Sequence, residues 1–272
     1  MDSQLVLNNI RKEFKEYITK TKLKSVILGI SGGMDSALVA AIVKPVCDDI
    51  GVKLIGISLP SASNKKLEVD RADMIMYHFC TESQTIKIND YVQTFRSNLL
   101  PTTLVSKEQK ISFGNMKART RMMILYHIAY ENSGMVLGTD NLTELNLGFW
   151  TLHGDVGDYS MIQYLWKSEV YELSQWIVDN ELLMRQEAAQ ALIRCIEAVP
   201  TDGLGITNSD LDQIGVKTYA EVDTIFKEYF AEGKHKDSPV IQRHLRTQFK
   251  RDNPHIITRE TLGFPLTYTV KF

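Results

Sequence analysis

The chain has 272 residues, 44% of them hydrophobic, and a formal net charge of −2 at pH 7. This balance is typical of a globular protein and gives no reason to expect binding to nucleic acid or to a membrane surface. The three cysteines lie far apart without a C-x-x-C pair, so neither a disulfide framework nor a zinc site is expected, and the predicted location is a reducing cytoplasm. No apolar run approaches the roughly 18 residues that suggest a membrane span, and the first residues lack the apolar core of a signal peptide.

Strands and helices alternate in the first half of the chain. Apolar β-branched runs predict strands at 25–30, 52–59, 85–88 and 135–139, and helical spacing predicts helices at 3–20, 35–49, 65–79 and 116–131. Strands that alternate with helices join through right-handed crossovers into a parallel sheet. The predicted fold class is therefore α/β, a Rossmann-like doubly wound parallel sheet with helices on both faces. Ligands of such sheets bind at the carboxyl ends of the strands.

The second half of the chain is less regular. Residues 101–114 have the composition of a surface loop, and residues 146–165 are rich in glycine, aspartate and aromatic residues without a clean period. Helices are predicted at 168–178, 187–198, 208–214, 220–230 and 237–250, with a turn at 200–203. Because neither a repeat nor a linker is visible, we expect one domain over residues 1–272, with 234–272 as a C-terminal extension.

One stretch has the features of a phosphate-binding site. The strand at 25–30 is followed by Ser31-Gly32-Gly33-Met34-Asp35-Ser36 and then by a helical run of small residues. A helix start offers unpaired N–H groups and the positive end of the helix dipole, and the two glycines let the backbone approach phosphate oxygens. Asp35 would repel phosphates, and a Mg²⁺ ion between them removes the conflict. The alternative is a capped Gly-Gly turn without a ligand.

This pattern differs from the two commoner phosphate loops. It has neither the lysine of G-x-x-x-x-G-K-[ST] nor the spacing of G-x-G-x-x-G. It resembles S-G-G-x-D-S, the pyrophosphate loop of ATP pyrophosphatases, which split ATP into AMP and pyrophosphate. Because the whole pattern lies between a predicted strand and a predicted helix, we favour the pyrophosphate loop over a simple turn.

A second candidate group follows the strand at 135–139. Thr139 ends this strand and would touch a nucleotide, while Glu144 lies about one helical turn beyond Asp140 and would complete a Mg²⁺ site with Asp35. The alternative is that Asp140 caps a short helix whose first turn is stabilised by Glu144.

Two basic segments are also candidates. Lys117 and Arg121 share one face of a helix, which suits either phosphate or exposed ion pairs. Lys167 follows a turn that contains Asp158, and the alternative for this pair is an Asp-Gly loop with a surface lysine.

Taken together, these motifs resemble those of one family, NAD synthetase. Gly114-Asn115-Met116-Lys117-Ala118-Arg119-Thr120-Arg121-Met122 is similar to the family's G-N-x-K-A-R-x-R-M segment, and Gly138-Thr139-Asp140 with Glu144 is similar to its G-T-D-x-x-x-E. Gly148-Phe149, Gly154-Asp155, Lys167 and Pro200-Thr201 follow in the family's order. The pyrophosphate loop alone occurs across ATP pyrophosphatases, whereas these further motifs are far more specific.

The resemblance implies a fold of the adenine nucleotide alpha hydrolase-like type and a reaction. ATP adenylates the nicotinate carboxylate of deamido-NAD and releases pyrophosphate, and ammonia then attacks the acyl-adenylate to give NAD and AMP. Glutamine-dependent members carry an additional amidase domain, for which we see no room in 272 residues, so ammonia is the expected nitrogen donor. The resemblance also implies a homodimer.

The resemblance assigns site residues position by position. The ATP-binding set implied is Gly29, Ile30, Ser31, Gly32, Gly33, Met34, Asp35, Ser36, Thr139, Lys167 and Thr201. Within this set Asp35, Ser36 and Lys167 are the implied catalytic residues, and Asp35 and Glu144 are the implied Mg²⁺ ligands. The residues implied to bind deamido-NAD are Arg119, Asp158, Phe249 and Lys250.

The departures from the family pattern lie on the dinucleotide side. The segment from Gly154 to Asp158 is one residue shorter than the frequent G-D-G-x-x-D, and Phe249 stands where a histidine is frequent. Two alternatives stay open. One is another pyrophosphate-loop enzyme, an amidating or tRNA-modifying ligase, for which the basic stretch 234–251 leaves room. The other is a nucleotide sensor without catalysis.

Overall fold

The computed structural model describes residues 1–99, 106–199, 211 and 214–264. Its sheet has four parallel strands in the order β3-β2-β1-β4. These strands are β1 (Ser25–Gly29), β2 (Lys53–Ser58), β3 (Glu82–Thr85) and β4 (Gly134–Val136). In the register, Val26 of β1 pairs with Leu54 on one side and with Met135 on the other. The expected α/β fold with a parallel sheet is confirmed.

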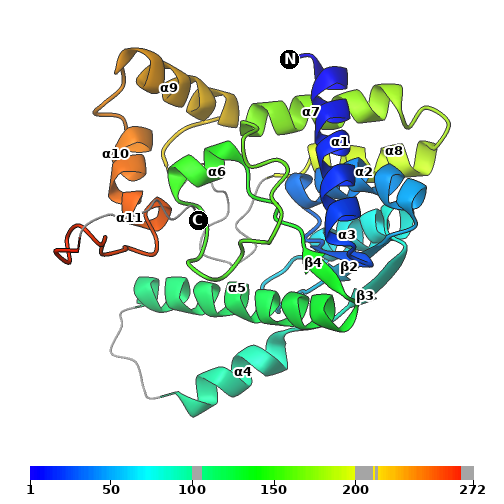
Figure 1. Cartoon of the computed structure of the whole chain (residues 1–272), viewed down its shortest axis with the longest axis horizontal. Helices are drawn as coiled ribbons and strands as arrows, with labels where there is room; N and C mark the ends of the chain where they lie inside the picture. Colours follow the sequence, from blue (N-terminus) through cyan, green and yellow to red (C-terminus); the bar gives the residue numbers. More distant parts are fainter. Residues whose placement is uncertain (100–105, 200–210, 212–213, 265–272) are drawn as a thin grey trace.

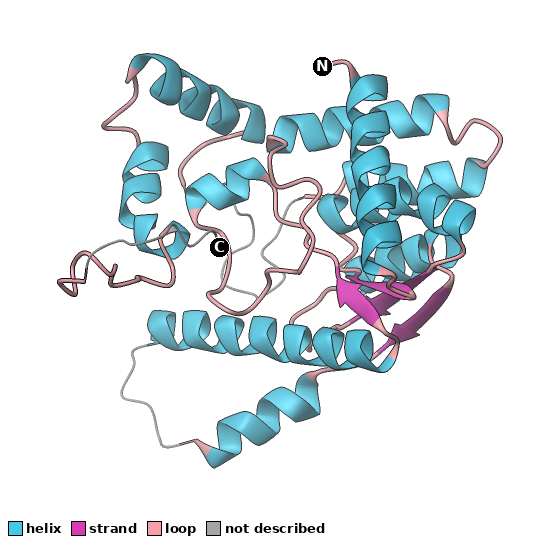
Figure 2. Cartoon of the chain, viewed as in Figure 1, coloured by secondary structure: helices cyan, strands magenta, loops and turns pink. Residues whose placement is uncertain are grey.

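The strand side chains alternate between two hydrophobic clusters, one on each face of the sheet, as the period of two in a β-strand requires. Val26 and Leu28 belong to the cluster that also contains buried residues of α1 (Ser3–Thr21), α2 (Met34–Ile50), α3 (Lys66–Phe79), α7 (Lys167–Asn180) and α8 (Gln186–Ile196). Ile27 belongs to the cluster formed with α4 (Asn89–Asn98) and α5 (Ser106–Glu131). Figures 1 and 2 show the sheet between α5 on one side and the group of α1, α2 and α3 on the other.

A third hydrophobic cluster lies beside these layers. It joins α6 (Leu142–Leu147), α9 (Tyr219–Glu232) and α10 (Pro239–Arg246), and it includes Leu147, Phe226 and Ile241. The short helix α11 (Gln248–Arg251) follows α10, and Figure 1 shows α9, α10 and α11 next to one another with α6 between them and the sheet. This cluster packs α9 and α10 against α6, the helix that follows β4.

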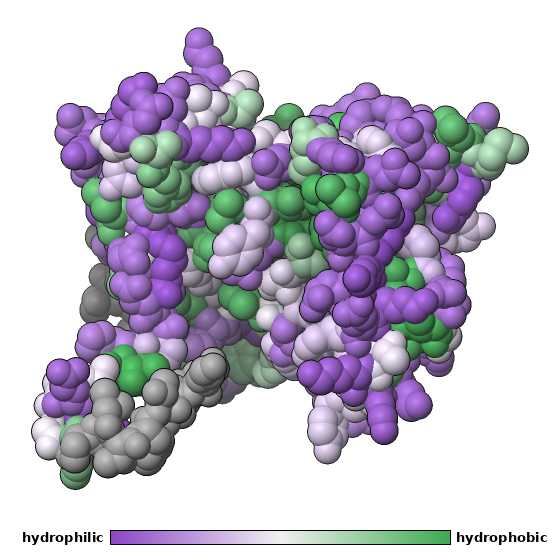
Figure 3. Space-filling model, turned by 45° about the horizontal axis from the view of Figure 1, so that its top comes forward, coloured by the Kyte–Doolittle hydropathy of each residue, from purple (hydrophilic) through white to green (hydrophobic). Residues whose placement is uncertain are grey.

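The surface fits the composition. Figure 3 shows a mostly hydrophilic face on which apolar side chains form small groups. Within the described ranges, no helix is both long and apolar enough to cross a membrane.

Two helical predictions are wrong in their bounds. The loop predicted over 101–114 is replaced from Ser106 onward by the first turns of α5. Gly114 does not break this helix, because Phe113 packs into the cluster with α4 and lies under the guanidinium of Arg96, 5.1 Å from its ring centroid. Tertiary packing of this kind overrides the low helix propensity of glycine. The helix predicted over 237–250 is divided into α10 and α11 at Thr247.

Two further elements differ from expectation. β3 comprises residues 82–85 rather than 85–88. Its four exposed residues pair with β2 through the backbone, so no apolar pattern marks them. The apolar Ile86 and Ile88, which suggested the strand, follow it and pack in the core. α4 was not predicted, and Val92 is its one buried residue. The predicted turn at 200–203 and most of the predicted helix at 208–214, all but residues 211 and 214, lie outside the described residues.

Candidate active site

The candidate site is a cavity of about 880 Å³ at the carboxyl edge of the sheet. The strand order places β2 and β3 on one side of β1 and β4 on the other, so the winding of the sheet reverses between β1 and β4. A crevice at such a reversal is where α/β sheets bind ligands. The loop that follows β1 and Thr139, which follows β4, both line the cavity, as the sequence predicted.

The loop from Ser31 to Ser36 is held by its own hydroxyl groups. The Ser31 hydroxyl accepts a hydrogen bond from the Gly33 N–H at 3.1 Å, and the two serine hydroxyls lie 3.2 Å apart. The Ser36 hydroxyl donates to the Gly33 carbonyl at 3.2 Å. Gly33 is the N-cap of α2 and has no side chain to cap the helix. The residues at the start of α2 line the cavity, so a helix N-terminus lies there in a preformed turn of the kind that suits phosphate.

Gly32 fixes how closely this loop approaches α3. Its φ is +78°, in the left-handed region, and a Cβ atom there would lie 2.2 Å from the Glu68 carbonyl oxygen. Both the conformation and the contact require glycine. On the same side, Arg71 of α3 donates from Nε to the Gly32 carbonyl at 2.7 Å. The loop is therefore shaped by α3 as well as by β1 and α2.

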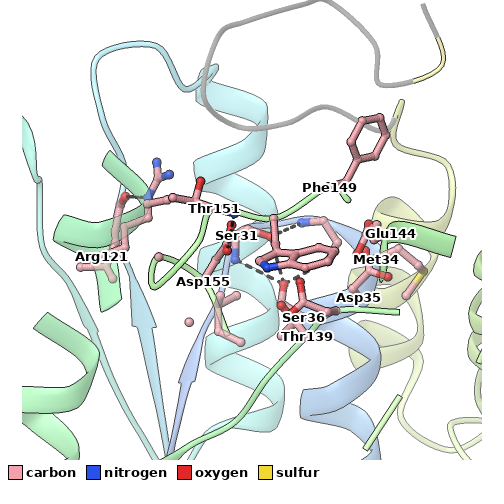
Figure 4. A pocket seen from close by; sticks show the side chains of 18 of the residues that line it. Ser31, Met34, Asp35, Ser36, Arg121, Thr139, Glu144, Phe149, Thr151 and Asp155 are labelled. Carbon is pink, nitrogen blue, oxygen red and sulfur yellow. Dashed lines mark hydrogen bonds between the residues drawn. The ribbon is translucent and has the colours of Figure 1, made fainter. Parts of the chain in front are cut away.

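A buried lysine joins two carboxylates at the edge of the cavity. The Lys167 ammonium contacts Oδ2 of Asp35 and lies 3.1 Å from Oε1 of Glu144. Burial lowers the pKa of Lys167, but the charges of Asp35 and Glu144 outweigh it and hold that pKa well above its usual range. Asn141 donates from Nδ2 to Oδ1 of Asp35 at 2.9 Å, so this carboxylate is fixed on both oxygens. Figure 4 shows Asp35 and Glu144 at one end of the cavity and Arg121 at the other.

Elements far apart in the sequence hold Lys167 in place. It is the first residue of α7, and its N–H donates to the Thr143 hydroxyl at 2.8 Å. The next amide, that of Ser168, donates to the Asp223 carboxylate of α9 at 2.9 Å. Asp223 is 1% exposed and also accepts the Thr143 hydroxyl. The start of α7 is thus capped from α6 and α9, which the sequence did not reveal because no local pattern connects these residues.

Helix α6 bears out one half of the alternative for this segment: Glu144 stabilises its first turn, but Asp140 does not cap it. Its N-cap is Asn141 rather than Asp140, and Asn141 exchanges hydrogen bonds with Glu144 in a capping box. Asp140 instead lines the cavity, where burial and then the charge of Asp155 raise its pKa well above the usual range. Burial also raises the pKa of Asp155 to about 6. This acidic pair was not assigned a role from the sequence, and its elevated pKa values mark it as a feature of the site.

Of the two basic candidates on α5, Lys117 is buried and Arg121 is half-buried. Arg121 lines the cavity, donating to the Leu59 carbonyl at 3.0 Å, and burial lowers its pKa. Lys117 donates to the Ser63 hydroxyl at 2.9 Å. The alternative of an exposed face with ion pairs is therefore wrong for these two side chains.

The residues predicted to bind the dinucleotide divide into two groups. Lys250 lines the first cavity and an adjoining one of about 680 Å³, which Arg119 also lines. Phe249 is 61% exposed and lines neither cavity. Asp158 also lines neither, because its carboxylate accepts from the Val136 N–H at 3.0 Å and from a tyrosine hydroxyl. Lys250 itself is fixed by the carbonyls of Gly148, at 2.7 Å, and Trp150.

Most of the predicted ATP set comes together. Nine of its members line the first cavity: Gly29, Ile30, Ser31, Gly33, Met34, Asp35, Ser36, Thr139 and Lys167. Glu144, the second predicted Mg²⁺ ligand, lines it as well. Gly32 lies behind them against α3. Thr201 lies outside the described residues.

The fold and this site define a class. A parallel sheet whose winding reverses beside a strand, a glycine-rich loop and a helix start is the fold of the adenine nucleotide alpha hydrolase-like class. The family model for NAD synthase matches residues 6–259. The chain belongs to the NAD synthase family.

Comparisons with individual proteins agree. The chain is 31% identical over 241 residues to the NH3-dependent NAD(+) synthetase of Thermoplasma acidophilum, covering 87% of this chain and 91% of that one. It is similar to the structure of an NH3-dependent NAD synthetase from Campylobacter jejuni, with a TM-score of 0.71 and 25% identity over 95% of this chain and 100% of that one. It shares its fold with an NMN synthetase from Francisella tularensis, with a TM-score of 0.75 and 24% identity over the full length of both.

Proposed function

We propose that the chain converts deamido-NAD, ATP and ammonia into NAD, AMP and pyrophosphate through an acyl-adenylate. One observation carries the proposal: the preformed phosphate loop and the Asp35–Lys167–Glu144 centre share one cavity in a chain of the NAD synthase family. Ammonia is the proposed nitrogen donor, and the name of the Thermoplasma acidophilum relative, 91% of which this chain covers, supports it.

The chemistry explains why ATP is needed. A carboxylate is a poor acyl acceptor at neutral pH because of its negative charge. Adenylation forms a bond between a carboxylate oxygen and the α-phosphorus and breaks the α–β phosphoanhydride, with the electron pair leaving on pyrophosphate. Ammonia then attacks the neutral acyl carbon, the bond from this carbon to the AMP oxygen breaks, and the nitrogen gives up one proton to AMP or to water. Oriented N–H groups and cations aimed at the departing charge lower the barrier of the first step.

In this proposal the ATP half of the cavity binds the triphosphate. The N–H groups of Met34, Asp35 and Ser36 would donate hydrogen bonds to the phosphate oxygens, and Thr139 would contact the nucleotide from the end of β4. The Lys167 ammonium would stand beside the phosphates as the catalytic cation, oriented by Asp35 and Glu144. Thr201 stays a prediction of the same kind.

The donor set fits Mg²⁺ as a companion of ATP. Asp35 and Glu144 offer carboxylate oxygens on the same side of the cavity, and Mg²⁺ usually binds one or two carboxylates together with substrate phosphates. Among the described residues no group of three or more His, Cys, Asp or Glu side chains forms a metal site by itself. A metal that arrives with the nucleotide is consistent with both facts. When bound, Mg²⁺ would neutralise charge on the phosphates.

The dinucleotide half is proposed in the adjoining cavity. Arg119 and Lys250 line it and would face the phosphates or the carboxylate of deamido-NAD. Phe249 and Asp158 keep their predicted roles only if ligand or a second subunit reaches them. A homodimer is proposed on the same basis, and the exposed Tyr130 of α5 is one of the apolar side chains available to such a contact.

Domain organisation and cellular location are proposed as well. We propose one domain over residues 1–272 with 234–272 as its extension, and the third cluster supports a close association of residues 239–246 with α6. A cytoplasmic location stays a prediction from the cysteines. Another pyrophosphate-loop ligase and a non-catalytic nucleotide sensor are the alternatives that the experiment below separates.

The test is product analysis with ATP, Mg²⁺ and deamido-NAD, with ammonium in one reaction and glutamine in the other. We expect NAD, AMP and pyrophosphate with ammonium only. A parallel reaction with the deamidated form of NMN addresses the fold shared with an NMN synthetase. AMP and pyrophosphate release that ignores both carboxylates would point to another ligase, and ATP binding without cleavage would point to the sensor. Asp35→Asn and Glu144→Gln are expected to abolish metal-dependent turnover.

A further inference from the structure

Arg71 of α3 reaches the phosphate loop from outside the sequence motif. Its Nε atom donates to the Gly32 carbonyl at 2.7 Å across 39 positions of the sequence. The side chain is half-buried and lines the same cavity as Ser31 and Gly33. The guanidinium is therefore attached to the loop on the side where α3 touches it, and nothing in the motif itself points to this residue.

The positive charge of Arg71 differs from that of Lys167 in the same cavity. The charge of Lys167 is balanced by Asp35 and Glu144. On α3, Glu68 directs its carboxylate to the Asn64 amide at 2.9 Å and to a backbone N–H, and Asp70 pairs with Lys66. Among the residues that the structure describes, no carboxylate forms an ion pair with Arg71. Its charge is thus available to an anion held in the loop.

The shape of the group supports the same use. A guanidinium has five N–H donors in one plane, and the bond to Gly32 uses only the Nε–H. The Nη groups remain for oxygens of a tetrahedral anion, which arginine binds in bidentate fashion. Anchoring by Nε also reduces the side-chain entropy lost when a ligand binds.

We propose that Arg71 binds the terminal phosphates of ATP and stabilises the departing pyrophosphate. As a carboxylate oxygen bonds to the α-phosphorus, the bond from that phosphorus to the α–β bridging oxygen breaks, and the electron pair and its charge move onto pyrophosphate. Arg71 sits where this charge would develop, next to the loop. The inference uses only the ATP half of the proposed function and holds for any carboxylate that the enzyme adenylates.

A purely structural role, in which Arg71 only holds the loop, makes a different prediction. A loose loop would weaken every adenine nucleotide, whereas a lost phosphate contact would weaken only ligands that carry the terminal phosphates. The experiment therefore compares ATP, AMP and pyrophosphate in the presence of Mg²⁺. ATP and AMP affinities are measured by titration calorimetry without deamido-NAD, and pyrophosphate is measured as a product inhibitor.

The variants are Arg71→Gln, which removes the charge, and Arg71→Lys, which keeps it. Arg185→Gln is the matched control, because Arg185 also donates to a carbonyl of α3, that of His78 at 2.8 Å, but lies outside the cavity. Thermal unfolding of each variant checks that the fold is retained.

For Arg71→Gln we expect the affinities for ATP and pyrophosphate to fall about ten- to a hundredfold, the range typical of a lost charged hydrogen bond, with AMP changed less than about threefold. Arg71→Lys should recover part of the loss, and Arg185→Gln should match the wild type. Equal losses for ATP and AMP, or none for either, would overturn the proposal. If ATP binding depends on Arg71 but the wild type forms no NAD, the proposal for Arg71 stands. Only the proposed substrate, deamido-NAD, would then be contradicted.

Discussion

Replacing Lys167 by methionine tests how the centre of the site is held together. The lysine is 4% exposed, and the side chains of its partners Asp35 and Glu144 are 17% and 18% exposed. Removing one member of a buried pair costs about 3–5 kcal/mol, because the remaining charge has lost its partner. Since both carboxylates keep some contact with water, we expect a loss at the lower end of this range, about 3 kcal/mol. At about 2–4 °C per kcal/mol this is a fall of roughly 6–12 °C in Tm.

The variant should also respond differently to Mg²⁺. Without the ammonium, Asp35 and Glu144 repel each other, and a divalent cation would relieve this repulsion. We therefore expect MgCl₂ without ATP to raise the Tm of Lys167→Met more than that of the wild type, in differential scanning calorimetry at low ionic strength.

A control variant shows whether the loss of stability is specific to Lys167 or would follow from replacing any paired lysine by methionine. Lys15 forms an exposed pair with Asp49, with side chains 51% and 60% exposed, so Lys15→Met should change stability by less than about 1 kcal/mol. A Lys167→Met protein that melts with the wild type, or gains no more from Mg²⁺, would refute the view that this lysine balances the two carboxylates.

Three further changes have defined outcomes. Gly32→Ala should reduce ATP affinity at least about tenfold in titration calorimetry, because its Cβ would meet a carbonyl oxygen at 2.2 Å. Gly51→Ala is the control: nothing lies within 4 Å of its Cβ, so it should cost only about 1 kcal/mol of stability for its positive φ. Equal effects of the two substitutions would refute the close approach of the Gly32 loop to α3. Asp223→Ala should lower urea-unfolding stability by about 2–4 kcal/mol and lower kcat, because it caps the helix that begins with Lys167; unchanged kcat in folded protein would contradict this. Burial lowers the pKa of His244, so the native state binds fewer protons than the unfolded chain, and stability should fall as pH drops below about 6.5 toward the folded pKa; a slope unchanged in His244→Phe would count against it.

The sequence predicted the parts of the site that depend on local pattern. The loop from Ser31 to Ser36 follows β1, and Thr139 follows β4, so the rule for parallel sheets alone brought them to one edge. Asp35 and Glu144 were expected together as Mg²⁺ ligands for the same reason, whereas Lys167, which contacts both carboxylates, entered the site only through the family resemblance because it begins another helix.

Residues that act through tertiary packing were not predictable. Arg71, Asp140 and Asp223 belong to segments whose local pattern is explained by helix caps, turns or solvent exposure. Their roles depend on which helices meet above the sheet, and a single sequence holds no signal for that. The beginning of α5 was missed for the same reason, since Gly114 reads as a break until Phe113 is seen packed against α4.

The most direct test of the reaction is an isotope transfer. Deamido-NAD labelled with ¹⁸O in its nicotinate carboxylate is incubated with the enzyme, ATP, Mg²⁺ and ammonium, and the products are analysed by mass spectrometry. If the carboxylate attacks the α-phosphorus and ammonia then displaces AMP, each AMP formed carries one ¹⁸O atom and pyrophosphate carries none. Unlabelled AMP formed together with NAD, or label in pyrophosphate, would contradict the acyl-adenylate.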